Sequence, residues 1–142
     1  MINSTNAAVQ TVESTKNVLF SNDRIRTNSC KSCCEGWLSH DLGSGLFTIT
    51  KPGIYEIGFN ANVATPTDVE LNPITLNITN AGESISGGEM VTTPAAVEEY
   101  YNVAATILLR VTCNSSVTIS IKNNSANNIF VSQANLFIIR EA

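Results

Sequence analysis

The chain has 142 residues, of which 43% are hydrophobic and only 14% are charged, and its formal net charge is −4. This length fits a single domain with one core, and the aliphatic content argues against intrinsic disorder. The eight Lys and Arg residues form no cluster that would neutralise nucleic-acid phosphates, no apolar run reaches the roughly 20 residues of a membrane span, and the N-terminus lacks the features of a secretory signal.

The first sixteen residues are polar and show no periodicity. Such a segment is either a frayed terminus or an arm that docks on another molecule. We therefore divide the chain into an N-terminal arm, residues 1–16, and a head domain, residues 17–142. If the arm docks, we expect its apolar side chains Ile2, Val9 and Val12 to make the anchoring contacts.

Short apolar stretches follow the arm and alternate with polar breaks. Residues 17–20 are predicted to form a first short strand. The polar, cysteine-rich residues 24–35 are predicted to be a loop. Trp37 and Leu38 are then expected to bring the chain back to the core.

The cysteines are the main candidates for chemistry. Cys30, Cys33 and Cys34 lie in one Cys-x-x-Cys-Cys segment, and His40 follows it. Thiolates and imidazole are the usual ligands of Zn²⁺, so these four residues could bind zinc, although adjacent cysteines do not easily face one ion. A disulfide, within the chain or between subunits, and three unligated thiols are the alternatives. Cys113 is expected to be a small buried hydrophobe.

The central region carries the clearest strand pattern. Residues 46–50 and 54–64 are predicted to be two strands of one hairpin, with Pro52 and Gly53 in the turn. In the second strand, apolar residues alternate with polar or small ones, which indicates an antiparallel strand that is buried on one face. No segment of the chain shows a helical period.

The remaining strands follow at a spacing of roughly 8–12 residues, which predicts an all-β sandwich of about eight strands. Pro73 is expected to mark a bulge or a sheet edge, and residues 85–93 are weakly patterned. The later predicted strands are residues 69–78, 100–111, 117–121 and 129–140.

Two predicted strands carry large apolar side chains on both faces, at residues 107–109 and 137–139. In a monomeric sandwich one of these faces would meet water. A subunit interface would cover it, and coverage by a loop is the alternative. The low charge of the chain favours an interface, because few ions would need to be desolvated when subunits pack.

A family resemblance rests on the same central region. Phe47, Gly53, Tyr55 and Phe59 follow the pattern aromatic, five residues, Gly-x-Tyr-x-aliphatic-x-Phe, with Ile57 at the aliphatic position. This pattern resembles the jelly-roll superfamily of the complement first-component globular head and tumour necrosis factor. The resemblance implies a homotrimeric jelly-roll β-sandwich of about eight to ten antiparallel strands, and a binding or structural module rather than an enzyme.

The superfamily packs three sandwiches about a threefold axis through aromatic and aliphatic side chains. Periodicity does not say which large side chains of this chain lie in the core of one sandwich and which lie at the axis. The candidates for trimer interface or core are Tyr55, Phe59, Leu108, Phe137 and Ile139.

Within the superfamily the chain resembles the short, Asn- and Thr-rich versions of Gram-positive bacteria and their tailed phages. We therefore expect a non-enzymatic virion structural protein, a trimeric head fibre or capsid decoration at the virion surface. Its partners would be other virion proteins, bound by the arm, and host carbohydrate or protein. A ligand-binding module of a bacterial or spore surface is the alternative. The chain has one histidine and no nucleophile, phosphate or dinucleotide motif, so the sequence does not favour an enzyme. The resemblance also implies a Ca²⁺ site at Asp68 and Glu70, although solvent-facing acids explain these two residues better, which leaves zinc as the cofactor hypothesis.

Overall fold

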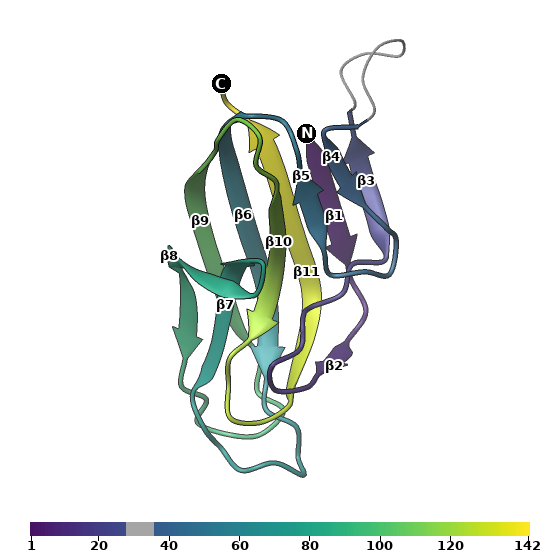
Figure 1. The fold of residues 1–142 in the computed structure, drawn as a ribbon. Helices are drawn as coiled ribbons and strands as arrows, with labels where there is room; N and C mark the ends of the chain where they lie inside the picture. The colour runs from purple at the N-terminus through teal and green to yellow at the C-terminus, as the bar shows by residue number, and fades with distance from the viewer. Residues whose placement is uncertain (28–35) are drawn as a thin grey trace.

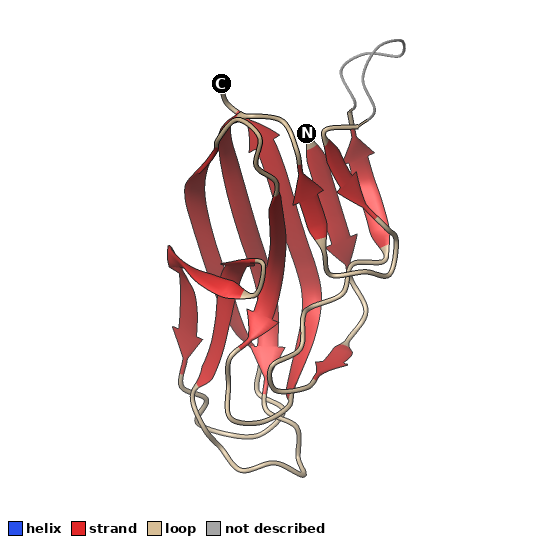
Figure 2. Ribbon diagram, in the orientation of Figure 1, coloured by secondary structure: helices blue, strands red, loops and turns tan. Residues whose placement is uncertain are grey.

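The computed structural model describes residues 1–27 and 36–142, which form eleven β-strands (Figure 1). Figure 2 shows strands joined by loops. No helix long and apolar enough to cross a membrane is found among the described residues. The expected all-β class is confirmed, with more strands than the eight to ten expected. The strands are β1 (Ile2–Asn6), β2 (Gln10–Val12), β3 (Asn22–Arg26), β4 (Leu38–His40), β5 (Phe47–Ile49), β6 (Gly53–Ala64), β7 (Ile74–Asn80), β8 (Glu83–Thr92), β9 (Tyr101–Val111), β10 (Val117–Asn123) and β11 (Ile129–Arg140).

The strands form two antiparallel sheets that pack face to face, as the layers in Figure 1 show. The six-stranded sheet has the order β3-β1-β11-β6-β9, and β2 also pairs with β11. The five-stranded sheet has the order β4-β5-β10-β7-β8. Most neighbours in each sheet are far apart in the sequence, so the fold depends on long-range pairing of strands.

The core lies between the two sheets, and β6 supplies its centre. Tyr55, Ile57 and Phe59 are fully or almost fully buried, as the alternation of this strand predicts. Phe20 packs edge-on against Phe59 and Phe47, with ring centroids 6.3 Å and 5.4 Å apart. Such edge-to-face pairs are a favourable arrangement for aromatic rings.

The prediction that residues 46–50 and 54–64 form one hairpin is wrong. β5 pairs with β4 and β10 in the five-stranded sheet, whereas β6 pairs with β9 and β11 in the six-stranded sheet. The segment between them crosses from one sheet to the other, and the Tyr55 hydroxyl donates a hydrogen bond of 2.7 Å to the Lys51 carbonyl within it. A Pro-Gly turn predicts a change of direction, but it does not say whether the next strand stays in the same sheet.

Residues 1–16, predicted to be an arm outside the head, instead contribute two strands to the six-stranded sheet. β1 pairs with both β11 and β3. Ile2 and Val12 are buried in the core, and Val9 is exposed. The pattern of β1 is hard to recognise because Ile2 is its only apolar side chain, so the strand is held largely by main-chain pairing.

Three smaller differences concern strand limits. Residues 17–20 are not a strand, although Val18 and Phe20 are buried as expected. The strand predicted from residue 69 begins only at Ile74, after Pro73, whose missing N–H favours a strand end. The weakly patterned residues 85–93 lie mostly in β8.

The expected return of the chain to the core after the cysteine-rich segment is confirmed. Leu38 is buried in β4. Trp37 is half-buried, and its ring lies 5.5 Å from that of Tyr55.

Candidate interaction surface

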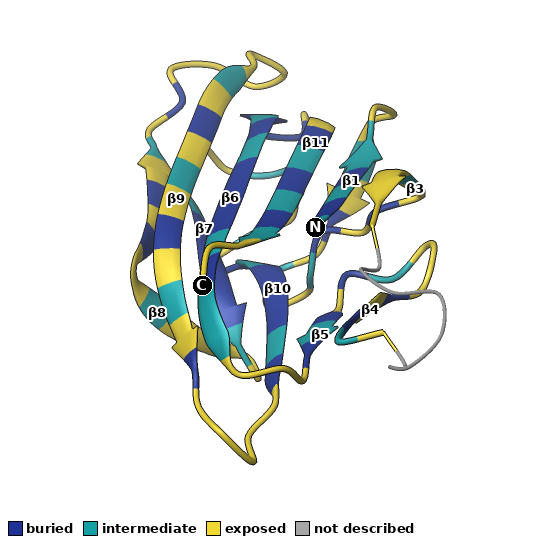
Figure 3. Ribbon diagram, turned by 90° about the horizontal axis from the view of Figure 1, so that it is seen from above, coloured by how far each residue is buried: buried dark blue, intermediate teal, exposed yellow. Residues whose placement is uncertain are grey.

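The outer face of the six-stranded sheet combines exposed and half-buried apolar side chains from neighbouring strands. The strand register places Leu108 of β9, Glu56 of β6 and Ile139 of β11 side by side. Leu108 is 69% exposed and Ile139 is half-buried. Figure 3 shows the alternation of buried and exposed positions along β9. We call Leu108, Ile139 and the adjacent Phe137 the apolar band.

The ring of Phe137 lies over β6 in the space left by Gly58, which has no side chain. Phe137 pairs with Gly58 in the register, and a Cβ at Gly58 would clash with the Phe137 ring. The absence of a side chain at this strand position therefore lets the ring lie close against the backbone of β6. On the far side of the ring, β1 and β3 add Asn3 and the 42% exposed Ile25.

A pair of carboxyl groups interrupts the apolar band. Glu56 lies between Leu108 and Ile139, and its hydrogen bond with Glu141 raises the pKa of the Glu56 carboxyl above its ordinary value. Desolvation and the charge of Glu141 raise this pKa further. Arg110 of β9, two positions from Leu108 on the same face, is the nearest cation along that strand.

The Glu56 carboxyl should make any association of this face pH-dependent. An acid whose pKa is raised in the folded, covered state binds its proton more tightly in that state than in the other. Its contribution to the free energy of that state is therefore favourable at low pH and is lost as the pH rises. Covering the apolar band desolvates Glu56 further. We expect association to weaken as the pH rises above the ordinary glutamate value of 4.5.

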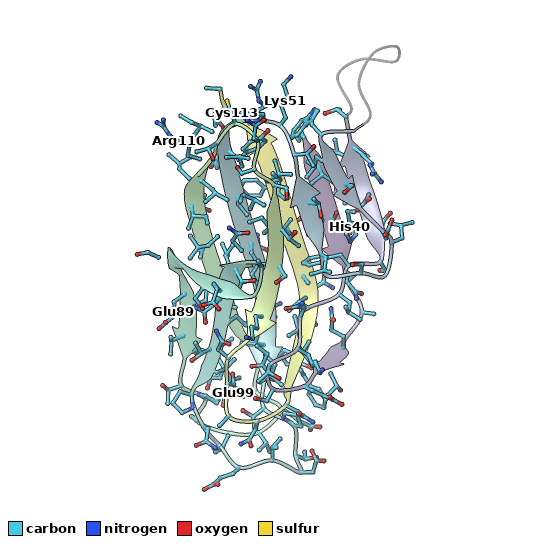
Figure 4. The ribbon with its side chains drawn as sticks, in the orientation of Figure 1. His40, Lys51, Glu89, Glu99, Arg110 and Cys113 are labelled. Atoms are coloured by element: carbon cyan, nitrogen blue, oxygen red, sulfur yellow. The ribbon has the colours of Figure 1, made fainter. Side chains whose placement is uncertain are left out.

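The measurement is the association midpoint of the wild type and of Glu56→Gln at about pH 5 and about pH 8. The wild type should dissociate more readily at the higher pH, and Glu56→Gln should show little change. The control is Glu99→Gln, which should behave as the wild type does. Glu99 is exposed and lies at the end of the sandwich opposite to Arg110 and Cys113 in Figure 4. An identical pH response in wild type and Glu56→Gln would contradict this role.

A second group of side chains crosses the same face below the apolar band. Asn60 of β6 lies opposite Asn135 of β11, and Asn62 of β6 lies opposite Asn102 of β9. We call these four residues the amide band. The Asn102 side-chain amide donates 3.2 Å hydrogen bonds to the Asn62 side chain and to the Ala61 carbonyl.

A bulge in β11 brings Asn135 to this position. The register of β11 against β6 shifts between Ser132 and Asn135, and Gln133 within the shift has a positive φ of 52°. A bulge inserts one extra residue and so changes which face the following side chains occupy. The bulge therefore directs Asn135, and after it Phe137 and Ile139, to the outer face. Neither the amide band nor this bulge was predicted from the sequence.

The structure divides the five residues predicted to lie in the trimer interface or core. Tyr55 and Phe59 lie in the core. Leu108, Phe137 and Ile139 lie on the outer face. Periodicity places side chains on one of two faces, but only the packing of the second sheet decides which face is the inner one.

The structure gives His40, predicted to be a zinc ligand, other partners. The side chain is buried, and its Nδ1 and Nε2 atoms lie 2.8 Å from Asp23 Oδ1 and 2.9 Å from the Ser44 carbonyl oxygen. The ring also stacks on Phe47 at a centroid distance of 4.1 Å. Both nitrogens are therefore used within the sandwich, where Figure 4 shows the residue.

The remaining predicted ligands, Cys30, Cys33 and Cys34, lie outside the described residues. Within residues 1–27 and 36–142, no three or more His, Cys, Asp or Glu side chains gather in a way that could hold a metal ion. Cys113 is exposed rather than buried. The alternation of β9 ends at Val111, and the turn that follows, with Asn114 at a φ of 59°, carries Cys113 to the surface.

Cys113 lines an open depression of about 430 Å³ together with Arg110 and Ala142. Its walls come from the ends of β6 and β9 and from Ala142 at the end of the chain. Figure 4 labels Arg110 and Cys113 in this region. The lining is mostly apolar and does not direct several polar groups at one point, as a binding site for a small polar ligand requires. We therefore do not include this depression in the candidate interaction surface.

Comparison with known proteins gives matches in structure only. No family model matches the sequence, and no curated protein matches it. The globular domain of the zebrafish complement 1qA protein superposes with a TM-score of 0.67 at 14% identity, over 99% of this chain and 96% of that one.

Murine APRIL is also similar in structure. Its structure at pH 5.0 superposes with a TM-score of 0.53 at 9% identity, over 95% of this chain and 97% of that one. Its structure at pH 8.5 gives a TM-score of 0.52 at 10% identity, over 92% and 96%. At these identities the likeness concerns the fold alone: the chain has the jelly-roll fold of the complement globular head and of APRIL.

Proposed function

We propose that this protein is a non-enzymatic homotrimeric module whose subunits associate through the outer face of the six-stranded sheet. The observation that carries the proposal is the apolar band, in which Leu108 is 69% exposed beside Phe137 and Ile139. Large apolar side chains that are accessible on one face of a folded domain are typical of an interaction surface.

The charge pattern supports a second copy of the same chain as the occupant of this face. The chain carries a net charge of −4, so two copies repel each other wherever acidic surfaces meet. The rows of the outer face contain mainly apolar side chains and amides, with one base, Arg110, and two acids, Glu56 and the Glu141 to which it is hydrogen-bonded. Contact through this face therefore brings few like charges together and desolvates few ions.

The number three comes from the fold. The sequence resemblance implies sandwiches packed about a threefold axis, and the similarity to the complement globular head supports the same fold. A rotation that closes after three copies leaves no unpaired interface, so growth stops at a defined size.

Two observations support a function other than catalysis. The chain has one histidine, and both ring nitrogens of His40 are used in structural contacts. A general base must reach the proton that it removes, and this imidazole is enclosed.

Light scattering on the purified chain tests the proposal. We expect one species with three times the monomer mass of 15.2 kDa at micromolar concentration. A monomer at all concentrations, with the sandwich folded, would remove the homotrimer and with it this function.

For the location we propose the surface of a phage particle, as a head fibre or capsid decoration. The support is the resemblance to the short Asn- and Thr-rich phage proteins and the weakly charged surface. Since residues 1–16 are part of the sandwich, attachment to other virion proteins would use exposed surface of the folded head. Mass spectrometry of purified virions should find the protein. Finding it only on spores or bacterial surfaces would favour the alternative location.

A further inference from the structure

The amide band has hydrogen-bonding capacity that the single subunit does not use. Asn3 donates a 2.6 Å hydrogen bond to the Asn135 side-chain oxygen, and Asn102 donates to the Asn62 oxygen. These bonds leave the side-chain N–H groups of Asn135 and Asn62 available. Among the described residues, the side-chain hydrogen bonds on this part of the face join Asn3, Asn62, Asn102 and Asn135 to their partners, and none involves the Asn60 side chain.

The position of this band matters because it lies on the proposed interface. Asn60 and Asn135 occupy the second row below Leu108 and Ile139, next to Gly58 and Phe137. A molecule that binds over the apolar band therefore also covers the amide band. A covered amide that finds no partner destabilises the assembly by its full desolvation cost.

An amide is also self-complementary. Each asparagine carries two N–H donors and one acceptor oxygen, so the same side chain on another copy can satisfy it. A strongly charged partner would find no opposite charge in this band. These properties favour a second copy of this chain as the molecule that covers the band.

We infer that the amide band determines how many copies associate and in which register, through hydrogen bonds between asparagines of neighbouring subunits. The inference rests on the homotrimer proposed above. Apolar surfaces alone attract without direction and tolerate slippage. A buried asparagine layer stabilises only the arrangement in which its amides meet, as single asparagines do in coiled coils at a cost in stability.

The test is a double variant, Asn60→Leu with Asn135→Leu, analysed by light scattering and native mass spectrometry. We expect this variant to stay associated but to form species of at least two masses, whereas the wild type forms one. The pair Asn60→Thr with Asn135→Thr keeps a hydrogen-bonding group on a residue that suits strands, and it should keep the wild-type mass. Asn72→Leu, in the loop before β7, is the matched control and should also keep it.

The outcomes separate the two proposals. A trimeric wild type whose leucine double variant has the same single mass would overturn this inference and leave the trimer intact. A variant that becomes monomeric overturns it too, because the amides would then supply affinity rather than specificity. A monomeric wild type removes the proposed function itself. If the double variant does not fold, Asn62→Leu with Asn102→Leu tests the next row in the same way.

Discussion

Replacing Leu108 with lysine is expected to dissociate the proposed trimer into folded monomers. Leu108 is the most exposed of the large hydrophobic side chains in the described residues, and it stands in the apolar band beside Glu56 and Ile139. A lysine at this position would place an ammonium group under the neighbouring subunit, where it loses its water without gaining a fixed partner.

The expected loss of association free energy follows from what is known of central residues in protein interfaces. Disrupting a central apolar contact costs about 2–4 kcal/mol, which weakens association by roughly 30- to 1,000-fold. The fold should be preserved, because the side chain points away from the core. Sedimentation or light scattering across a dilution series measures the shift in the association midpoint.

Leu42→Lys is the matched control. Leu42 is 66% exposed, almost the same as Leu108, but it lies in the loop between β4 and β5. This variant should retain the mass of the wild type. If both lysine variants dissociate equally, or if neither does, the outer face of the six-stranded sheet is not the interface.

Replacing Asp23 with alanine is expected to cause a large loss of stability without changing the surface used for association. Asp23 Oδ1 lies 2.8 Å from His40 Nδ1 and also accepts a hydrogen bond from the Ser4 hydroxyl. The side chains of His40 and Asp23 are 0% and 9% exposed. These contacts join β1 and β3 of one sheet to β4 of the other.

The buried hydrogen bonds of Asp23 explain the expected size of this loss. Asp23 Oδ1 lies beside His40 Nδ1 and accepts from the Ser4 hydroxyl, so the alanine leaves both of these groups without that partner. Removing the carboxylate leaves a buried imidazole without its main partner. Leaving a buried hydrogen-bonding group without its partner costs about 1–3 kcal/mol for each group, and the melting temperature should fall by about 10 °C.

Thermal and urea unfolding of the two chains at one protein concentration measures this loss, since the melting temperature of an oligomer depends on concentration. Asp41→Ala removes an exposed acid next to His40 and should change the stability by less than about 0.5 kcal/mol. Equal stability of Asp23→Ala and Asp41→Ala would show that the buried contacts contribute nothing.

The strands that are easy to recognise in the sequence have strong period-two patterns. β6, β9 and β10 were predicted within one or two residues of their limits, because buried aliphatic and aromatic side chains recur at every second position. β1 was missed for the opposite reason, since its residues are polar apart from Ile2. Its place in the sheet depends on main-chain bonds to β11, a strand more than 120 residues later.

The candidate site was predicted in part. The double apolar character of residues 107–109 and 137–139 indicated an uncovered face, and Leu108, Phe137 and Ile139 lie on it. The amide band was not recognised, because its asparagines lie on three strands and the bulge at Gln133 sets their alignment. A signal was present in the 17 asparagines of the chain, but composition does not say where they gather.

The sequence by itself determined the class of the fold, since alternation along single strands is a local property that each segment carries alone. It also determined that the surface is polar and weakly charged. Only the tertiary structure decided that Tyr55 and Phe59 face the core while Phe137 faces outward, and that His40 is bound to Asp23. Those outcomes depend on which distant strands pair and in what register. The pattern within one segment does not specify the strands that pair with it in the folded sheet.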